Sequence, residues 1–502
     1  MSCYLAFDLG TSAFKIALFD RRGRLIALSR QGYHTIDEHE VPPPAVWEAL
    51  RAGVDEVLGV SHLTAADVTG VGIASQTNSM VLLGPGGHEL TAIDLWTHNA
   101  ADAEARELEQ RFGADALGRT TGMPALLACQ VLPKLVRLRM AAPALIGPDV
   151  RVRLLPDYVV EGLCGQAASD GSLWALTGLY DLQSGSWWPA ALEAAGVSAG
   201  QLPKLARPGA LAGRTTAAAM ARLGLPSGIP VAVGSLDHLA AAVAVGNFGD
   251  GDLSESTGTV LCLMASTSAQ PSAAPNTIVG PHADATAGYY RLSYSQVSAY
   301  WLDWYAEKSG LSQTVLADAL AAAADVPPTC DGLAAVVGPS GDPADGPVFV
   351  NAATGVPGEP ATHAHAIRAI MEAVAYNLAD MMDSLAPIPA GPLPRGAGIP
   401  PARETGRQDA CTTACVFAVG GGASSPLWLQ IKADVLGLPI RTIECPQAAV
   451  LGAAIYAAVG AGQFADVRAA QAAWHRPGPT YVPDPVRRNM YAAQRKAMPA
   501  RR

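Results

Sequence analysis

The first apolar positions of the chain fall into two short runs separated by a glycine. Residues 3–7 are continuously apolar, Asp8 follows, Gly10 opens a Gly-Thr-Ser segment, and a second run covers residues 14–19. Apolar runs of this length, bounded by glycine and small polar residues, predict two β-strands joined by a turn. We therefore expect a hairpin with a carboxylate at its rim.

The hairpin at Gly10 is compatible with two roles. A glycine lets backbone N–H groups approach a ligand closely, and Thr11 and Ser12 add hydroxyl donors, so the turn is suited to hold an oxyanion such as a phosphate. Asp8 beside it is suited to hold a divalent metal. The alternative is a structural hairpin with a solvated aspartate, since Gly-Thr turns are common.

The same pattern recurs in the middle of the chain. Residues 249–266 predict a strand, a turn at Gly258-Thr259 and a second strand. Ahead of them, an apolar run ending at Gly234 predicts a strand, and residues 236–246 predict an apolar helix. Asp237 therefore lies in the first turn of a helix, where the helix dipole keeps a carboxylate ionised, as a proton acceptor requires. An aspartate that only stabilises the first turn is the alternative.

A glycine-rich segment lies nearer the C-terminus. The apolar residues 416–419 predict a strand, three glycines follow at 420–422, and Ser-Ser-Pro at 424–426 marks the start of a helix. Bare backbone of this kind lets a flat ligand lie against it. The spacing is not G-x-G-x-x-G, so a dinucleotide-binding fold is not indicated. Residues 386–410 are rich in proline and glycine and predict an exposed insertion ahead of the strand.

Length and hydropathy bound the class of protein. A chain of 502 residues is too long for one hydrophobic core, so two or more domains are expected. The mean hydropathy is +0.20, yet the longest apolar stretches stop short of the roughly 18 residues that a membrane span requires. No basic segment precedes the first apolar run, which Asp8 interrupts early, so no secretory signal is visible and we expect a cytoplasmic protein.

Cysteine spacing and charge exclude further classes. The eight cysteines lie apart with no C-x-x-C pair, which predicts reduced thiols and argues against zinc sites and iron–sulfur clusters. A formal net charge of −10 disfavours a nucleic-acid surface. The basic residues gathered in 486–502 are interpreted as the solvated face and tail of a last helix.

Taken in order, these segments resemble the FGGY family of carbohydrate kinases over nearly the whole chain. The segments that carry the resemblance are residues 7–20 (first phosphate hairpin), 234–246 (catalytic base), 256–259 (second phosphate hairpin), and 419–440 with 444–462 (adenosine motif and its closing helix). The resemblance implies an α/β, two-domain, actin-like (ribonuclease H-like) fold. The expected domains are residues 1–246 and 247–502, with the active site in the cleft between them.

The resemblance also implies roles for individual residues. Phosphoryl transfer needs positioning, charge stabilisation and a base rather than covalent work by the protein. Asp237 is expected to take the proton from a sugar hydroxyl, and Asp8 to orient magnesium through water. The residues expected around the phosphates are Gly10, Thr11, Ser12, Lys15, Gly258 and Thr259. The residues expected behind the adenosine are Gly420, Gly421, Gly422 and Ala423.

The sugar pocket departs from the family patterns. Xylulokinase-like members usually carry Gln-Met-His, and glycerol kinases Gln-Arg-Glu, where residues 76–78 read Gln-Thr-Asn. The family's Trp-x-Asp-x-Arg reads Trp-Thr-His-Asn-Ala at 96–100, so an ion pair that normally supports the sugar site is expected to be absent. The residues expected to contact the sugar are Gln76, Thr77, Asn78, Trp96, His98 and Asp237. A structural histidine is the alternative for His98.

Two other departures concern the nucleotide side. The loop ahead of residue 366 is shorter than in most relatives, which puts the region near the nucleotide in question. Val260 stands where relatives usually carry a serine. The absence of the serine removes one hydroxyl near the phosphates but leaves the backbone amides, so we expect activity to survive.

The sequence supports two functional hypotheses. The first is an ATP- and Mg²⁺-dependent kinase that transfers the γ-phosphate to a hydroxyl of a ketose or polyol, with a pentulose such as D-xylulose as the leading acceptor and ribulose, erythritol, a glycerol-like polyol or a heptulose as alternatives. The second is a nucleotide-binding protein of the same fold without kinase chemistry. Asp237 argues against the second, because a pure binder needs no base there. The expected partner is a small-molecule sugar, with neither nucleic acid nor membrane, and a homodimer is compatible with the resemblance.

Overall fold

The computed structural model describes residues 2–271, 276–385 and 415–498. The chain forms two compact units. The first comprises Met1–Phe248, Ser266–Arg291 and Gln447–Arg476, and the second comprises Gly249–Ala265, Leu292–Pro446 and Pro477–Arg502. Each unit is thus assembled from several segments, whereas the division at residues 246 and 247 follows the chain and stays a prediction. The insertion expected at 386–410 lies outside the described residues.

The first unit is built on a mixed sheet with the order β13-β14-β5-β1-β2-β3. Strand β1 pairs antiparallel with β2 and parallel with β5, and the short β15 also pairs parallel with β5. Every residue of β1 is buried, which explains its continuous apolar run, because a central strand is covered on both faces. The hairpin predicted around Gly10 is confirmed. The strands are β1 (Cys3–Leu9), β2 (Phe14–Asp20), β3 (Leu25–Gln31), β5 (Val68–Ser75), β13 (Leu211–Arg214), β14 (Pro230–Ala232) and β15 (Ser235–Leu236).

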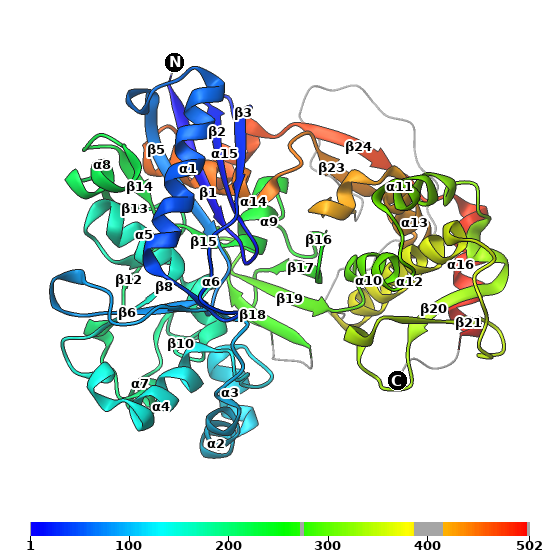
Figure 1. The fold of residues 1–502 in the computed structure, drawn as a ribbon, viewed down its shortest axis with the longest axis horizontal. Coiled ribbons are helices and arrows are strands. Elements are labelled where there is room, and N and C mark those ends of the chain that lie inside the picture. The colour runs from blue at the N-terminus through cyan, green and yellow to red at the C-terminus, as the bar shows by residue number, and fades with distance from the viewer. Residues whose placement is uncertain (1, 272–275, 386–414, 499–502) are drawn as a thin grey trace. The chain divides into compact units, whose positions relative to one another are not determined.

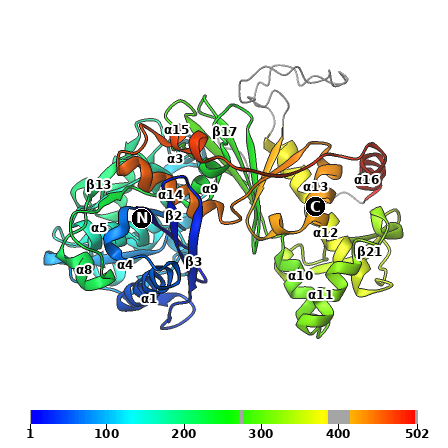
Figure 2. The same cartoon turned by 90° about the horizontal axis from the view of Figure 1, so that it is seen from above.

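Helices cover both faces of this sheet (Figures 1 and 2). Helix α1 (Pro43–Ser61) shares one hydrophobic core with Leu5 and Phe7. Helix α14 (Ala448–Gly460) packs on the other face at Gly72, where an added Cβ would lie 1.9 Å from the carbonyl oxygen of Ala453. Glycine is required at that contact, because any side chain would force the helix and the sheet apart.

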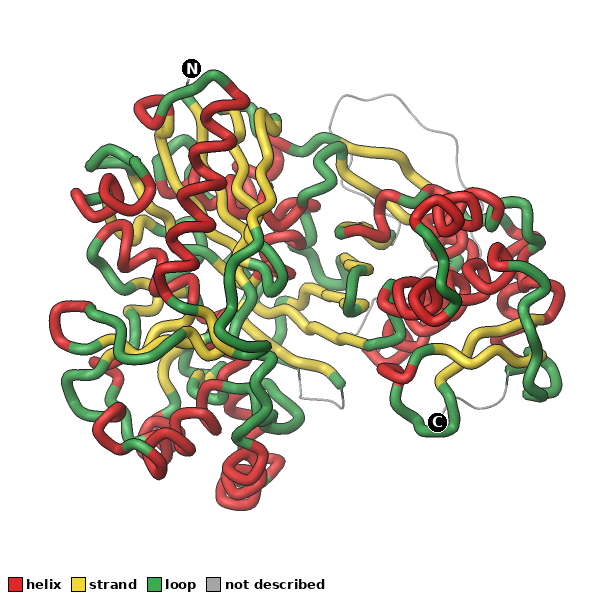
Figure 3. Tube along the Cα trace, in the orientation of Figure 1, coloured by secondary structure: helices red, strands yellow, loops and turns green. Residues whose placement is uncertain are grey.

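The second unit repeats the motif of a hairpin beside parallel strands. Strand β16 (Leu253–Thr257) pairs antiparallel with β17 (Leu261–Thr267) and parallel with β22 (Val416–Val419), followed by β23 (Ile440–Ile443) and β24 (Pro477–Tyr481). The predicted second hairpin and the strand–glycines–helix segment are therefore confirmed. Helices α12 (His363–Leu385), α13 (Pro426–Leu436) and α16 (Pro485–Ala497) complete this unit, and Figure 3 shows helices and strands in both units.

The remaining helices and strands are divided between the two units. In the first unit they are β4 (Glu40–Val41), β6 (Met80–Leu83), β7 (Ile93–Asp94), β8 (Arg151–Leu154), β9 (Ala168–Ser169), β10 (Tyr180–Asp181), β11 (Ser186–Trp187), β12 (Lys204–Leu205), β18 (Thr277–Pro281), α2 (Asp102–Phe112), α3 (Ala114–Thr121), α4 (Val131–Ala141), α5 (Leu155–Cys164), α6 (Gly171–Trp174), α7 (Pro189–Ala195), α8 (Ala217–Leu223), α9 (Asp237–Val245) and α15 (Val467–Trp474). In the second unit they are α10 (Tyr300–Lys308), α11 (Gln313–Ala322), β20 (Leu333–Val337) and β21 (Pro347–Asn351). Strand β19 (Tyr289–Ser295) crosses the boundary between the units.

Candidate active site

Three strands of the first unit end at the same level of the sheet. Leu9 of β1 is in register with Ser75 of β5, and Ser75 is in register with Leu236 of β15. All three strands run in the same direction, so the residues that follow, Gly10, Gln76 and Asp237, leave the sheet at one edge. The carboxyl ends of parallel strands are where open α/β sheets bind ligands. The strand register therefore places the first predicted phosphate turn and the predicted base at one edge of the sheet, on either side of Gln76.

Asp8 is buried one residue before the end of β1, with 5% of its surface exposed. Burial raises the pKa of Asp8, the ammonium of Lys15 lowers it, and the nearby carboxylate of Asp237 raises it again. The two aspartates thus interact electrostatically. The buried carboxylate of Asp8 is an oxygen donor of the kind that a hard divalent cation prefers, and its Oδ2 is paired with Lys15.

Lys15 faces Asp8 across the first hairpin. The two residues are in register between β1 and β2, and Nζ of Lys15 lies 3.0 Å from Oδ2 of Asp8. About a third of the lysine side chain is exposed. The ammonium group is therefore held beside the turn that starts at Gly10.

Thr11 connects this turn to two residues predicted for the sugar pocket. Its Oγ1 accepts a hydrogen bond from Nε1 of Trp96 at 2.7 Å and donates one to Oε1 of Gln76 at 3.3 Å. The hydroxyl of Tyr33 donates to the Thr11 carbonyl. Ser12, the next residue, is exposed. Thr11, Gln76 and Trp96 thus form one hydrogen-bonded group.

Asp237 is the first residue of α9 and is half-buried. Its Oδ1 accepts a hydrogen bond from the backbone N–H of His238 at 2.7 Å. The preceding strand is held by Ser172, whose Oγ accepts from the N–H of Leu236 at 3.1 Å, and by the Tyr456 hydroxyl, 2.8 Å from Oγ of Ser235. Sequence reasoning missed Ser172 and Tyr456, because nothing near either residue in the chain signals its partner.

Two predicted sugar residues form hydrogen bonds with the backbone. Oγ1 of Thr77 donates to the Leu173 carbonyl at 2.6 Å. Asn78 donates from Nδ2 to the Leu176 carbonyl at 3.1 Å and accepts at Oδ1 from the N–H of Val131 at 3.3 Å. These contacts hold together segments that are distant in sequence. Contacts of Thr77 and Asn78 with a sugar stay predictions.

His98 belongs to a charged cluster that the sequence did not indicate. Its Nδ1 lies 2.9 Å from Oδ1 of Asp94, and its ring stacks on His39 with ring centroids 5.0 Å apart. The buried Nζ of Lys134 lies 3.3 Å from the same Asp94 oxygen and donates to the carbonyl of Leu95. Burial lowers the pKa of Lys134, and Asp94 raises it. Lys134 and Asp94 thus form an ion pair next to His98, at positions other than those of the family's Trp-x-Asp-x-Arg motif.

The predicted nucleotide residues of the second unit also meet at strand ends. Ser256 of β16 is in register with Val419 of β22, which places the Gly258 turn next to the glycine loop. A Cβ on Gly422 would lie 2.7 Å from the Cβ of Thr257, whereas one on Gly421 would lie 3.8 Å from its nearest neighbour. The loop therefore needs a glycine at 422 because it lies directly against β16. Thr259 and Ala423 lie in the same two segments.

A fully buried ion pair lies behind these two segments. Nζ of Lys432 in α13 is 2.6 Å from Oε1 of Glu255 and donates to Oγ1 of Thr257 at 2.7 Å. Thr257 in turn donates to Oε2 of Glu255 at 2.7 Å. The sequence signal was present but weak: a lysine among the apolar positions of one helix and a glutamate within one strand.

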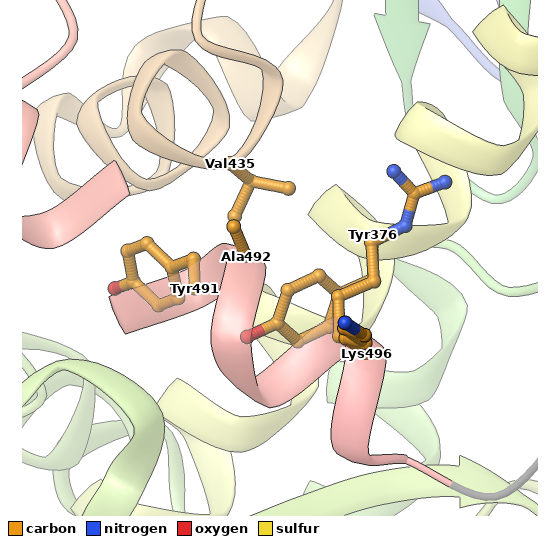
Figure 4. Close-up of a pocket in the computed structure, with 6 residues that line it drawn as sticks. Tyr376, Val435, Tyr491, Ala492 and Lys496 are labelled. Atoms are coloured by element: carbon orange, nitrogen blue, oxygen red, sulfur yellow. The ribbon is translucent and has the colours of Figure 1, made fainter. Parts of the chain in front are cut away.

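A separate cavity of about 380 Å³ lies in the second unit (Figure 4). It contains none of the predicted site residues, and Arg495 at its wall is paired with Asp380 and Asp383. The lining residues are Tyr376, Val435, Tyr491, Ala492, Arg495 and Lys496. Within the described ranges, no three His, Cys, Asp or Glu residues are grouped to hold a metal, and no helix is both long and apolar enough to cross a membrane.

Comparison with family models identifies the class of protein. The N-terminal domain of the FGGY family of carbohydrate kinases matches residues 3–244, and its C-terminal domain matches residues 253–461. The chain therefore belongs to the FGGY family of carbohydrate kinases. Members are ATP-dependent phosphotransferases with an alcohol group as acceptor, so the resemblance seen in the sequence is confirmed, and the enzyme class with it.

Individual relatives span nearly the whole chain. Autoinducer-2 kinase of Klebsiella pneumoniae subsp. pneumoniae is 26% identical over 518 residues, covering 98% of this chain and 92% of its own. Xylulose kinase of Escherichia coli K12 is 28% identical over 480 residues, covering 93% and 90%. The crystal structure of xylulose kinase from Rhodospirillum rubrum superposes with a TM-score of 0.80 at 24% identity, covering 98% and 97%. The predicted actin-like, ribonuclease H-like fold is therefore confirmed.

Proposed function

We propose that this kinase transfers the γ-phosphate of ATP to a hydroxyl of a ketose or polyol, with a pentulose such as D-xylulose as the leading acceptor. The observation that carries the proposal is the common register at which β1, β5 and β15 end, so that the Gly10 turn and Asp237 leave the same edge of the sheet on either side of Gln76. A phosphate site beside a base is what transfer to a hydroxyl requires. The similarity to xylulose kinases supports the choice of acceptor. A cytoplasmic location is part of the same proposal.

The proposed roles divide between the two units. In the first unit, Asp237 accepts the proton of the acceptor hydroxyl, and Lys15 with the N–H groups of residues 10–12 neutralises phosphate charge. In the second unit, Gly258 and Thr259 contribute to the phosphate site, and the loop at 420–423 backs the adenosine. The position of the site between the two domains stays a prediction.

Magnesium fits the residues at the end of β1. The buried carboxylate of Asp8 offers the oxygen donors that Mg²⁺ prefers, and Asp8 would hold the ion through water. The bound ion would neutralise the negative charge of the phosphate oxygens.

A second acceptor is favoured by a specific departure. Residues 76–78 match neither the xylulokinase nor the glycerol kinase pattern, and relatives named autoinducer-2 kinase align over 98% of this chain. Autoinducer-2 is therefore the alternative acceptor.

The proposal is tested by ADP release from ATP and magnesium with D-xylulose, D-ribulose, erythritol, glycerol, a heptulose and autoinducer-2 in parallel. One compound should raise turnover by orders of magnitude, and Asp237→Asn should abolish that increase because the base is lost. The exposed Asp55→Asn on α1 is the matched control and should behave as the parent. Background turnover with every compound, or full activity of Asp237→Asn, would refute the proposal.

A further inference from the structure

Gln76 carries a buried amide donor that is unpaired among the described residues. Only 7% of the residue is exposed, and its Oε1 accepts the hydrogen bond of Thr11. Its Nε2 is buried and has no hydrogen-bond partner in the part of the chain that the structure describes. A buried donor without an acceptor is destabilising, so such groups in native proteins usually meet a ligand or water.

The hydrogen bonds around Thr11 fix the orientation of this amide. The indole Nε1 of Trp96 can only donate, and it donates to Oγ1 of Thr11. The hydroxyl proton of Thr11 remains available for another acceptor, and it points to Oε1 of Gln76. Nε2 is consequently the end of the amide turned away from Thr11.

The strand register places Gln76 between the predicted phosphate turn and the predicted base. Gln76 follows Ser75, which is paired on one side with Leu9, ahead of the Gly10 turn, and on the other with Leu236, ahead of Asp237. Thr77 and Asn78 donate to backbone carbonyls, whereas Nε2 of Gln76 has no hydrogen-bond partner among the residues that the structure describes.

We propose that Nε2 of Gln76 donates a hydrogen bond to the acceptor hydroxyl oxygen, which makes Gln76 a catalytic residue of the transfer. The inference rests on the function proposed above. The hydroxyl gives its proton to Asp237 and accepts a hydrogen bond from Gln76, which directs its remaining lone pair at the γ-phosphorus. The new oxygen–phosphorus bond forms as the bond from that phosphorus to the β–γ bridging oxygen breaks, and ADP leaves.

The experiment compares transfer to the sugar with transfer to water. The measured quantities are kcat and KM for the acceptor found in the panel, KM for ATP, and ATP hydrolysis without acceptor. In Gln76→Leu, kcat/KM for the acceptor should fall about 10- to 100-fold, as expected for losing one donor to an oxygen that becomes anionic. Hydrolysis by loosely held water and KM for ATP should each stay within about threefold. The ratio of sugar transfer to hydrolysis therefore falls.

Thr11→Val is the matched variant, because it breaks the same Thr11–Gln76 hydrogen bond but keeps Nε2. Because that hydrogen bond orients the amide, the ratio of sugar transfer to hydrolysis should fall in Thr11→Val as well, but less than in Gln76→Leu, since Nε2 remains. Gln76→Glu removes the donor and keeps the shape, so it covers the case in which Gln76→Leu does not fold, and the ratio should fall there too. An unchanged ratio in the Gln76 variants, or an equal fall in Thr11→Val, would overturn this inference alone. An inactive parent or an active Asp237→Asn would instead mean that the proposed function fails.

Discussion

Lys432 and Glu255 form an ion pair 2.6 Å long in which neither side chain reaches solvent. The pair links α13, which begins just after the glycine loop, to β16, which leads into the Gly258 turn. Hydrophobic residues of similar volume can be as stabilising as a buried ion pair, but they do not specify one position as narrowly. The pair thus holds the two predicted nucleotide segments in one arrangement.

Removing one partner of this pair should be costly. Lys432→Met leaves the Glu255 carboxylate buried without its counter-charge, so we expect the free energy of unfolding to drop by about 3–5 kcal/mol. Urea denaturation followed by circular dichroism measures this. Arg51→Met removes one partner of the exposed pair Arg51–Asp55 and should cost less than about 1 kcal/mol. Equal losses in the two variants would contradict this account.

At the contact of α14 with α9, replacing a helical glycine with alanine should change the stability in the opposite direction to the usual one. Glycine to alanine inside a helix normally stabilises by up to about 1 kcal/mol. At Gly452 the new Cβ would lie 2.1 Å from the carbonyl oxygen of Ala240, so Gly452→Ala should destabilise by about 1–3 kcal/mol. Gly59→Ala in α1, with nothing within 4 Å, should stabilise. Thermal unfolding of both variants measures the two changes in stability. A change of the same sign in both variants would disprove the explanation.

Alanine substitutions at two adjacent glycines should have different effects on KM for ATP. Gly422→Ala pushes a methyl group against Thr257, whereas Gly421→Ala meets its nearest neighbour at 3.8 Å. We expect KM for ATP to rise about tenfold or more in Gly422→Ala, since displacing the loop by such a clash costs about 1–3 kcal/mol. KM for the sugar should not change. The neighbouring Gly421→Ala should keep the parent's KM for ATP, and a rise in that variant alone would argue against this loop geometry.

Ionisation of the buried Asp157 carboxyl should make the protein less stable as the pH rises. This residue lies in the first turn of α5, and its burial raises the pKa to about 7, although hydrogen bonds from Ser169 and from the N–H of Leu154, with the charge of Arg153, lower it. Between about pH 4 and pH 7 the folded state then binds more protons than the unfolded state, so the free energy of unfolding decreases as pH rises. In Asp157→Asn, the decrease in the free energy of unfolding with rising pH should be smaller by about 1.4 kcal/mol per pH unit over this range.

Chemical denaturation at a series of pH values measures this slope. The exposed Asp55→Asn serves as the surface control and should reproduce the slope of the parent. A slope of Asp157→Asn identical to that of the parent would show that the carboxyl of Asp157 ionises normally in the folded protein.

The local elements of both units could be predicted from the sequence. The hairpins at Gly10 and Gly258, the helix that starts at Asp237 and the glycine loop before α13 all appear where the apolar runs and glycines indicate them. Each depends on backbone preferences and burial within about 20 consecutive residues, and short stretches of sequence record those preferences directly.

Only the tertiary structure decided which side chains meet. Lys432 reaches a glutamate 177 positions away, and Gln76 comes to lie between the Gly10 turn and Asp237 through the register of three strands. The polar atoms of Asn78, assigned to a sugar from the sequence pattern, are bound to the backbone at Leu176 and Val131. Strand order and register result from packing the whole chain, so no local pattern encodes them.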